Sequence, residues 1–135
     1  MKYLRKCNDC GLEAWNKEEL EWFAKDSTQK YGRKNYCEDC RKTRRRNDGL
    51  KAAYGITLQE YEELLQKQEG KCKICGTTDP KHKGVFHVDH NHNTGKIRGL
   101  LCHGCNTALG LFQDSPTILV KATEYLLKEG NYGNE

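Results

Sequence analysis

The eight cysteines are the feature that most constrains how this chain can fold. They form two sets with one spacing, a C-x2-C pair, 26 intervening residues and a second C-x2-C pair. The sets are Cys7, Cys10, Cys37 and Cys40, then Cys72, Cys75, Cys102 and Cys105. Two such pairs can present four thiolates to one tetrahedral zinc ion, so the spacing predicts two structural zinc sites. A cross-braced arrangement that exchanges pairs between the sets, and free or disulfide-bonded cysteines, are the alternatives.

The composition indicates why the fold needs such sites. Only 36% of the 135 residues are hydrophobic and 31% are charged, so apolar burial alone leaves a thin margin of stability. The first ten residues lack the apolar run of a signal peptide. No apolar stretch approaches the roughly 20 residues of a membrane-spanning helix. We therefore expect an intracellular protein in a reducing compartment, where spaced cysteines bind metal rather than form disulfides.

Net charge says little about partners, but its distribution is informative. The formal charge is +4, and eight thiolates with two zinc ions would bring it close to neutral. Residues 1–51 hold 14 Lys and Arg against 9 Asp and Glu, whereas residues 52–135 hold 9 against 10. The basic excess is concentrated in RKTRRR, from Arg41 to Arg46. Such a run is either a solvated helix face or a nucleic-acid contact.

Local signals divide the chain into three segments and predict a small zinc-stapled α+β fold. We expect a four-cysteine unit over residues 1–42, a basic helical arm over 43–56 and a second domain over 57–135. In the first unit, Asn16 and Glu19 resemble a capping box, which predicts a short helix over residues 17–23. The expected apolar side chains of this unit are Tyr3, Trp15, Leu20, Trp22 and Phe23.

In the second domain, Thr57 and Glu60 form another capping box before a helix with Gly70 near its C-cap. Residues 85–111 then read as strand, turn, strand and helix, because VFHVDH alternates apolar and polar residues and NHNTG is typical of a turn. Ser115 and Pro116 begin a last helix that Gly130 ends. Its expected apolar face contains Ile118, Leu119, Ala122, Tyr125 and Leu126.

Three side chains of this second domain can perform chemistry together. Asp89 offers a carboxylate and Asn106 a carbonyl oxygen, which are ligand types that magnesium prefers. His90 follows Asp89 in a strand, so its side chain projects to the opposite face and can address a water without binding the metal. Histidine suits proton abstraction near neutral pH. The pattern therefore favours a hydrolytic site with one metal and one base.

The segments CKICG, HVDHNH and GKIRGLLCHGCNTALG resemble the HNH, or ββα-metal, nucleases, and most closely the phage recombination endonuclease VII family. The likeness covers roughly residues 54–112. It implies a ββα-metal (His-Me finger) motif flanked by helices. It also implies hydrolysis of DNA phosphodiesters to 5′-phosphate and 3′-hydroxyl ends.

The same resemblance implies roles for particular residues. Asp89 and Asn106 would bind a catalytic magnesium or manganese ion, and His90 would be the general base. His87 and His92 are weaker candidates for contacting phosphate or assisting the metal, and packing is the alternative for His87. DNA backbone contacts are expected from Arg41, Lys42, Arg44, Arg45, Arg46 and Arg98.

Two positions depart from the family pattern. Asn91 replaces an acidic residue, and Leu109 stands one helical turn after Asn106 where an acidic residue can occur, so fewer carboxylates would hold the metal. One such site cuts one strand, which favours a homodimer, with a monomeric nicking enzyme as the alternative. A phage-encoded enzyme would act in the bacterial cytoplasm. The rival interpretation is a non-catalytic, zinc-dependent DNA-binding or assembly module.

Overall fold

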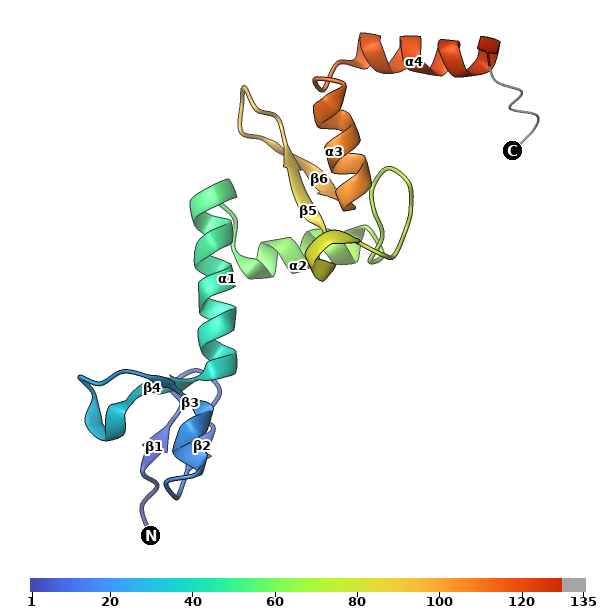
Figure 1. The fold of residues 1–135 in the computed structure, drawn as a ribbon. Helices are drawn as coiled ribbons and strands as arrows, with labels where there is room; N and C mark the ends of the chain where they lie inside the picture. The colour runs from blue at the N-terminus through green and yellow to red at the C-terminus, as the bar shows by residue number, and fades with distance from the viewer. Residues whose placement is uncertain (130–135) are drawn as a thin grey trace. The chain divides into compact units, whose positions relative to one another are not determined.

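The computed structural model describes residues 1–129, which divide into two compact units with the boundary after Glu60 (Figure 1). The boundary falls inside helix α2 (Leu58–Lys67). The fold is small and mixed, with four helices and three two-stranded antiparallel sheets within the described range. This agrees with the α+β class expected from the sequence.

The first unit contains two hairpins and a long helix. Strand β1 (Arg5–Lys6) pairs with β2 (Glu13–Ala14), and β3 (Phe23–Lys25) pairs with β4 (Arg33–Cys37), which runs directly into helix α1 (Glu38–Tyr54). A 3-10 turn, η2 (Lys30–Gly32), precedes β4. None of the four strands was expected, because each is too short to show a period of two in the sequence.

The helix expected over residues 17–23 is present only as the 3-10 turn η1 (Glu19–Trp22). Its capping box does form, since the backbone N–H of Glu19 donates to Asn16 Oδ1 at 2.9 Å and that of Trp15 to Glu19 Oε2 at 2.6 Å. The turn stops there because Phe23 enters strand β3 and is fully buried. Burial of a large aromatic side chain thus outweighs the local helical signal.

The core of the first unit is built around three of its cysteines. Its buried residues are Cys7, Ala14, Leu20, Phe23 and Cys37, with Leu4, Tyr36 and Cys40 packed against them. The expectation that Tyr3, Trp15 and Trp22 lie in this core is wrong, because all three are at least 36% exposed. Tyr3 and Trp15 instead contact each other edge to face on the surface. Only a small apolar volume can form around a metal site with so few core residues.

The second unit contains a ββα arrangement followed by a further helix. A 3-10 turn, η3 (His82–Gly84), precedes β5 (His87–His90), which pairs with β6 (Ile97–Leu101) and leads to α3 (His103–Leu111) and α4 (Pro116–Glu129) (Figure 1). The strands and helices expected over residues 85–111 are therefore confirmed. The predicted end of the last helix at Gly130 lies outside the described residues.

Helix α2 supports the ββα arrangement from one side. Its capping box forms as expected, with Glu60 N–H donating to Thr57 Oγ1 at 3.1 Å and Thr57 N–H to Glu60 Oε2 at 2.7 Å. The buried Tyr61 hydroxyl donates to the carbonyl of Phe86, just before β5, at 2.8 Å. Gly70, at φ 69°, ends this segment with a bond from its N–H to the Leu65 carbonyl.

Helix α4 is largely exposed to solvent. None of its side chains is fully buried, and Val120, Tyr125 and Leu127 are each more than half exposed. The expected apolar face is thus present on the helix but remains largely solvent-accessible. No helix within residues 1–129 has the length and apolar character needed to cross a membrane.

Candidate metal centres and active site

The cysteines form two separate four-thiol clusters, one in each unit. The ligand sulfurs of Cys7, Cys10, Cys37 and Cys40 lie within 4.8 Å of one another, as do those of Cys72, Cys75, Cys102 and Cys105. The distances from Cys10 Sγ to Cys37 Sγ and from Cys75 Sγ to Cys102 Sγ are both 3.8 Å. A zinc tetrahedron with bonds of about 2.3 Å places its sulfurs about 3.8 Å apart. The clusters therefore fit structural zinc, and the cross-braced and disulfide alternatives are wrong.

Backbone groups in each cluster favour the thiolate form that zinc requires. Burial opposes ionisation of Cys7, but N–H donors from Cys10, Cys37 and Asp9 lower its pKa to about 6. Burial likewise opposes ionisation of Cys72, whose pKa also falls to about 6 because backbone N–H groups point at the sulfur. One thiolate of each site is thus favoured before a cation binds, whereas burial and the neighbouring thiols raise the pKa of Cys105 to about 12.

The second cluster fixes the start of helix α3. Cys102 is the N-cap, and its sulfur accepts a hydrogen bond from the backbone N–H of Cys105 at 3.4 Å. Asn106 directly follows this ligand, is half-buried, and donates its N–H to the Cys102 carbonyl at 3.0 Å. Within residues 1–129 its side-chain amide has no hydrogen-bond partner. The cysteines of this cluster therefore fix the position of Asn106 relative to the end of β6, because they hold the first turn of α3 in place.

Asp89 is the one buried carboxylate of the second unit's described residues. It lies on β5 opposite Gly99 of β6, with an exposed fraction of 9%. Both of its oxygens accept hydrogen bonds from Arg98, Nε to Oδ2 at 2.7 Å and Nη2 to Oδ1 at 2.8 Å. Such a bidentate pair fixes the carboxylate plane.

A β-bulge explains how Arg98 reaches Asp89. The register pairs Asp89 with Gly99 but His90 with Ile97, so Arg98 is the additional residue on β6. In an unbroken ladder Arg98 would oppose His90 and point to the other face of the sheet. The bulge turns its side chain toward Asp89 instead. The pKa of Arg98 is raised, first by the hydrogen bonds to Asp89 and also by those to Asp114.

Asp114 completes this ion-pair cluster from the turn between α3 and α4. Arg98 Nη2 also donates to Asp114 Oδ2 at 3.1 Å, and His92 Nε2 lies 3.7 Å from the same oxygen. Gln113 and Asp114 both have positive φ, at 57° and 52°, which non-glycine residues adopt uncommonly. Backbone of this kind is retained where surrounding structure requires it. Asp114 belongs to no sequence motif, so no signal in the sequence could have identified it.

Asp89, Arg98 and Asp114 line one wall of a cleft of about 390 Å³. The other walls are mainly apolar, and their lining side chains include Ile74, Leu101, Leu109, Pro116 and Leu119. Leu109 thus faces this cleft where the family pattern can carry an acidic residue. Apolar walls reduce local solvation, so the ion pairs inside interact more strongly than on an open surface.

The histidines fall into two groups. His90 is half-buried at the end of β5, and its ring centroid lies 4.7 Å from that of the exposed His92. His87 lies instead beside His103, with centroids 5.3 Å apart, and its buried Nε2 has no hydrogen-bond partner in the described chain. Burial, and then the nearby His103, lower the pKa of His87. The geometry therefore associates His92, but not His87, with the Asp89 cluster.

Most of the basic run on α1 is paired with carboxylates of the same unit. Arg44 donates to both oxygens of Asp9 at 2.6 and 2.5 Å, and Arg41 Nε donates to Glu38 at 2.6 Å. Lys42 Nζ lies 4.0 Å from Asp39. The pKa of Asp9 is lowered, chiefly by the hydrogen bond from Arg44. The positive charge of this run is thus smaller than its sequence suggests.

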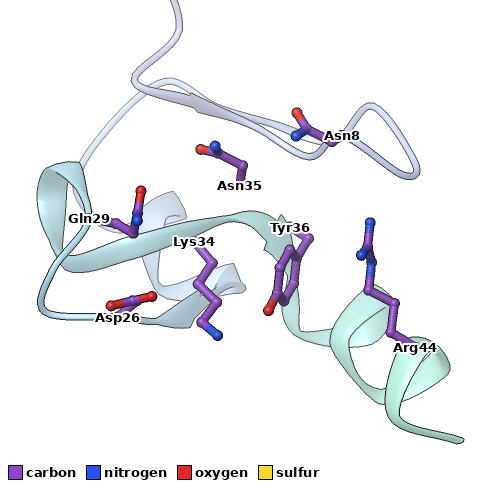
Figure 2. Close-up of a pocket in the computed structure, with 7 residues that line it drawn as sticks. All are labelled: Asn8, Asp26, Gln29, Lys34, Asn35, Tyr36 and Arg44. Atoms are coloured by element: carbon purple, nitrogen blue, oxygen red, sulfur yellow. The ribbon is translucent and has the colours of Figure 1, made fainter. Parts of the chain in front are cut away.

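Beside this helix lies a polar cleft of about 360 Å³ in the first unit (Figure 2). Lys34 and Arg44 flank the ring of Tyr36, with Lys34 Nζ 5.5 Å and Arg44 Cζ 5.0 Å from its centroid. Arg41 and Arg45 line the adjoining hollow with the same tyrosine. A cationic surface with an aromatic side chain at its centre is a feature of nucleic-acid interfaces.

The chain has similarity to several known proteins. It is 45% identical over 78 residues to the Gene 59 protein of Mycobacterium phage D29, which is 57% of this chain and 47% of that protein. It is 46% identical over 77 residues to the Gene 59 protein of Mycobacterium phage L5, covering 56% of this chain and 46% of that protein. The matched segment thus spans about half the length of these relatives.

A solved structure is also similar. The ββα-Me type II restriction endonuclease Hpy99I is 26% identical, with a TM-score of 0.40, over 96% of this chain and 72% of that one. Residues 47–128, which contain the second cysteine cluster and the Asp89 cluster, match the family described as Recombination endonuclease VII. The chain belongs to the recombination endonuclease VII family.

Proposed function

We propose that this protein is a metal-dependent DNA endonuclease that hydrolyses phosphodiester bonds to 5′-phosphate and 3′-hydroxyl ends. The observation that supports the proposal is the position of three residues in the ββα arrangement. Asp89 and His90 end strand β5, and Asn106 lies in the first turn of α3, which packs against β5. Membership of an endonuclease family supports the reaction class.

The donor set fits a hard divalent cation. Asp89 is buried and offers carboxylate oxygens, and Asn106 offers an amide oxygen with no other described partner. A carboxylate has about four lone-pair positions, so two remain on Asp89 beside the two that Arg98 uses. Magnesium or manganese is the ion that such oxygens suit. When bound, it would stabilise the charge that develops on the phosphate and on the leaving oxygen.

His90 would act as the general base. His90 directly follows Asp89 in β5, and alternation along a strand would direct its side chain to the other face of the sheet. It can therefore take a proton from the attacking water without competing for the cation. His92, which contacts the His90 ring, would help to orient it.

The first unit and its helix α1 would hold the DNA backbone. Arg41, Arg45 and the Lys34–Tyr36 surface lie on one side of α1, because residues 41, 44, 45 and 48 line the same hollow. Lys42 and Arg46 are about one-third of a turn away and would contact the backbone less directly. Such contacts position the nuclease without reading sequence.

A homodimer would let two active sites cut both strands or resolve a branched substrate. The exposed Val120, Tyr125 and Leu127 of α4 support this assembly, since apolar side chains on one helix favour self-association. Sedimentation velocity of the zinc-loaded protein is expected to give a dimer. Replacing Tyr125 and Leu127 by serine and lysine is expected to give a monomer that nicks but does not linearise plasmid.

One observation favours a second candidate, a non-catalytic zinc-dependent DNA-binding module. The bidentate Asp89–Arg98 pair is the arrangement that a purely structural aspartate would have. This candidate leaves the placement of His90 and Asn106 without an explanation, so the nuclease is the stronger proposal.

Cleavage of supercoiled plasmid with Mg²⁺ distinguishes the two candidates. Wild type is expected to nick the plasmid, and His90→Ala to lower the rate about 100- to 10,000-fold, the usual contribution of a general base. His82→Ala is the matched control, because it removes an exposed histidine of the 3-10 turn η3 whose ring lies beside His103 rather than His90, and it is expected to keep wild-type activity. Normal DNA binding by wild type without nicking of supercoiled, linear or four-way DNA would establish the non-catalytic module instead.

A further inference from the structure

The Asp89–Arg98–Asp114 cluster contains a carboxylate for which the proposed reaction has no role. We propose that Asp114 is a positioning residue of the active site, which fixes Arg98 so that Arg98 in turn holds Asp89 ready for the divalent cation. The inference rests on the proposed function, because it assigns the cation to Asp89. It gives Arg98 a role other than the phosphate contact expected from the sequence.

The hydrogen-bond geometry supports an orienting role for Arg98. Its Nε and Nη2 edge binds both oxygens of Asp89, at 2.7 and 2.8 Å, which leaves the outer lone pairs of that carboxylate for another ligand. Its Nη1 has no hydrogen-bond partner within residues 1–129. Partners of this kind orient metal-binding carboxylates and increase the affinity of the site.

The position of Arg98 in the β-bulge explains why a second carboxylate is needed to hold its side chain. The register shift between Asp89 and His90 leaves Arg98 without a place in the ladder, so its long side chain needs a second anchor to remain in one rotamer. Nη2 donates to Asp114 at 3.1 Å and supplies that anchor. The positive φ of Gln113 and Asp114 places the Asp114 carboxylate at this position.

Charge gives a second reason. Asp89 and Arg98 form a neutral pair, and Lys73, which lines the same cleft and donates to the Arg98 carbonyl at 2.7 Å, adds a positive charge that would repel a cation. Asp114 offsets that charge. The cleft also has apolar lining side chains, among them Leu101 and Leu109, so the charge of Asp114 is less screened than on an open surface. Asp114 thereby compensates for the absence of an acidic residue at Leu109.

The test measures Mn²⁺ binding to the full, zinc-loaded chain, from the electron paramagnetic resonance signal of free Mn²⁺. Asp114→Asn removes the charge but suits the backbone, because asparagine adopts positive φ more readily than most residues. It is expected to weaken Mn²⁺ binding about 10- to 100-fold, as loss of such supporting partners does. The matched control Glu124→Gln removes an exposed carboxylate of α4 and is expected to stay within about twofold of wild type.

A double-mutant cycle separates positioning from a general effect of charge. If Asp114 acts through Arg98, adding Asp114→Asn to Arg98→Ala is expected to produce no further loss of Mn²⁺ affinity. Zinc content and melting temperature verify that each variant is folded. Arg98→Met, which keeps the aliphatic stem, replaces Arg98→Ala in the cycle if the alanine variant does not fold.

Three results would overturn the inference. In the first, Asp114→Asn binds Mn²⁺ like Glu124→Gln while Asp89→Asn loses binding, which leaves the proposed nuclease intact. In the second, Asp114→Asn weakens binding equally with and without Arg98, which reduces Asp114 to a source of charge. In the third, Asp89→Asn binds Mn²⁺ like wild type, and the metal site of the proposed function fails as well.

Discussion

Strand β6 has one edge without a strand partner, and the side chain of Gln68 covers it. Leu100, which is fully buried, donates its N–H to Gln68 Oε1 at 2.9 Å, and Gln68 Nε2 donates to the Leu100 carbonyl at 2.9 Å. The same Nε2 also donates to the Lys71 carbonyl at 2.9 Å. The amide of Gln68 therefore acts as one residue of a third strand, next to the strand that carries Arg98.

Replacing Gln68 by leucine keeps the side-chain volume and removes these bonds. The buried N–H of Leu100 then has no acceptor, which costs about 1–3 kcal/mol. The Leu100 carbonyl still accepts a hydrogen bond from the N–H of Lys73 at 3.1 Å. Losing its bond from Gln68 Nε2 therefore adds only about 1 kcal/mol. The free energy of unfolding is thus expected to fall by about 2–4 kcal/mol, a large part of the roughly 5–15 kcal/mol available to a domain.

Urea denaturation followed by circular dichroism measures this change. Gln66→Leu is the matched control, because Gln66 is exposed near the end of α2, two residues before Gln68, and the chemical change is identical. Its free energy of unfolding is expected to stay within about 0.5 kcal/mol of wild type. If Gln68→Leu were as stable as Gln66→Leu, the side-chain amide would not be the partner of β6, and the reasoning would be refuted.

Three further predictions concern metal, pH and capping. Brief EDTA treatment is expected to stop cleavage reversibly, whereas verified removal of both zinc ions is expected to unfold the chain; retained circular dichroism without zinc would contradict this. Arg44 lowers the pKa of Asp9 in the folded protein, so this ion pair stabilises the fold fully at pH values above the ordinary aspartate pKa of about 3.9. The stabilisation is lost as the pH falls through the lowered pKa of Asp9 in the folded state. Asp9→Asn is therefore expected to show a smaller loss of melting temperature on acidification than wild type. Thr57→Ala removes the acceptor of the Glu60 N–H and is expected to cost about 1 kcal/mol in urea denaturation, with an unchanged value counting against the capping box.

The sequence predicted those parts of the fold that depend on local chemistry. The repeated C-x2-C spacing identified both thiol clusters. Each C-x2-C turn holds two of its ligands close together by local geometry, and a zinc site needs two such turns. The Thr57 capping box and the alternation around Val88 likewise predicted a helix and a strand that the structure contains. The short strands of the first unit escaped prediction because two- to five-residue pairings depend on a metal-centred core rather than on period.

Local pattern determined which side chains are available to the proposed active site, and tertiary structure decided which of their neighbours they contact. Asp89, His90 and Asn106 could be named from residue type and spacing, because ligand chemistry belongs to the side chains themselves. The pairing of Arg98 with Asp89 could not, since it depends on a bulge that turns one residue of β6 to the other face of the sheet. Asp114 was equally invisible, because its contact with Arg98 joins a strand to a turn 16 residues later in the chain. Only the packing of α3 on the hairpin brings that turn to the site.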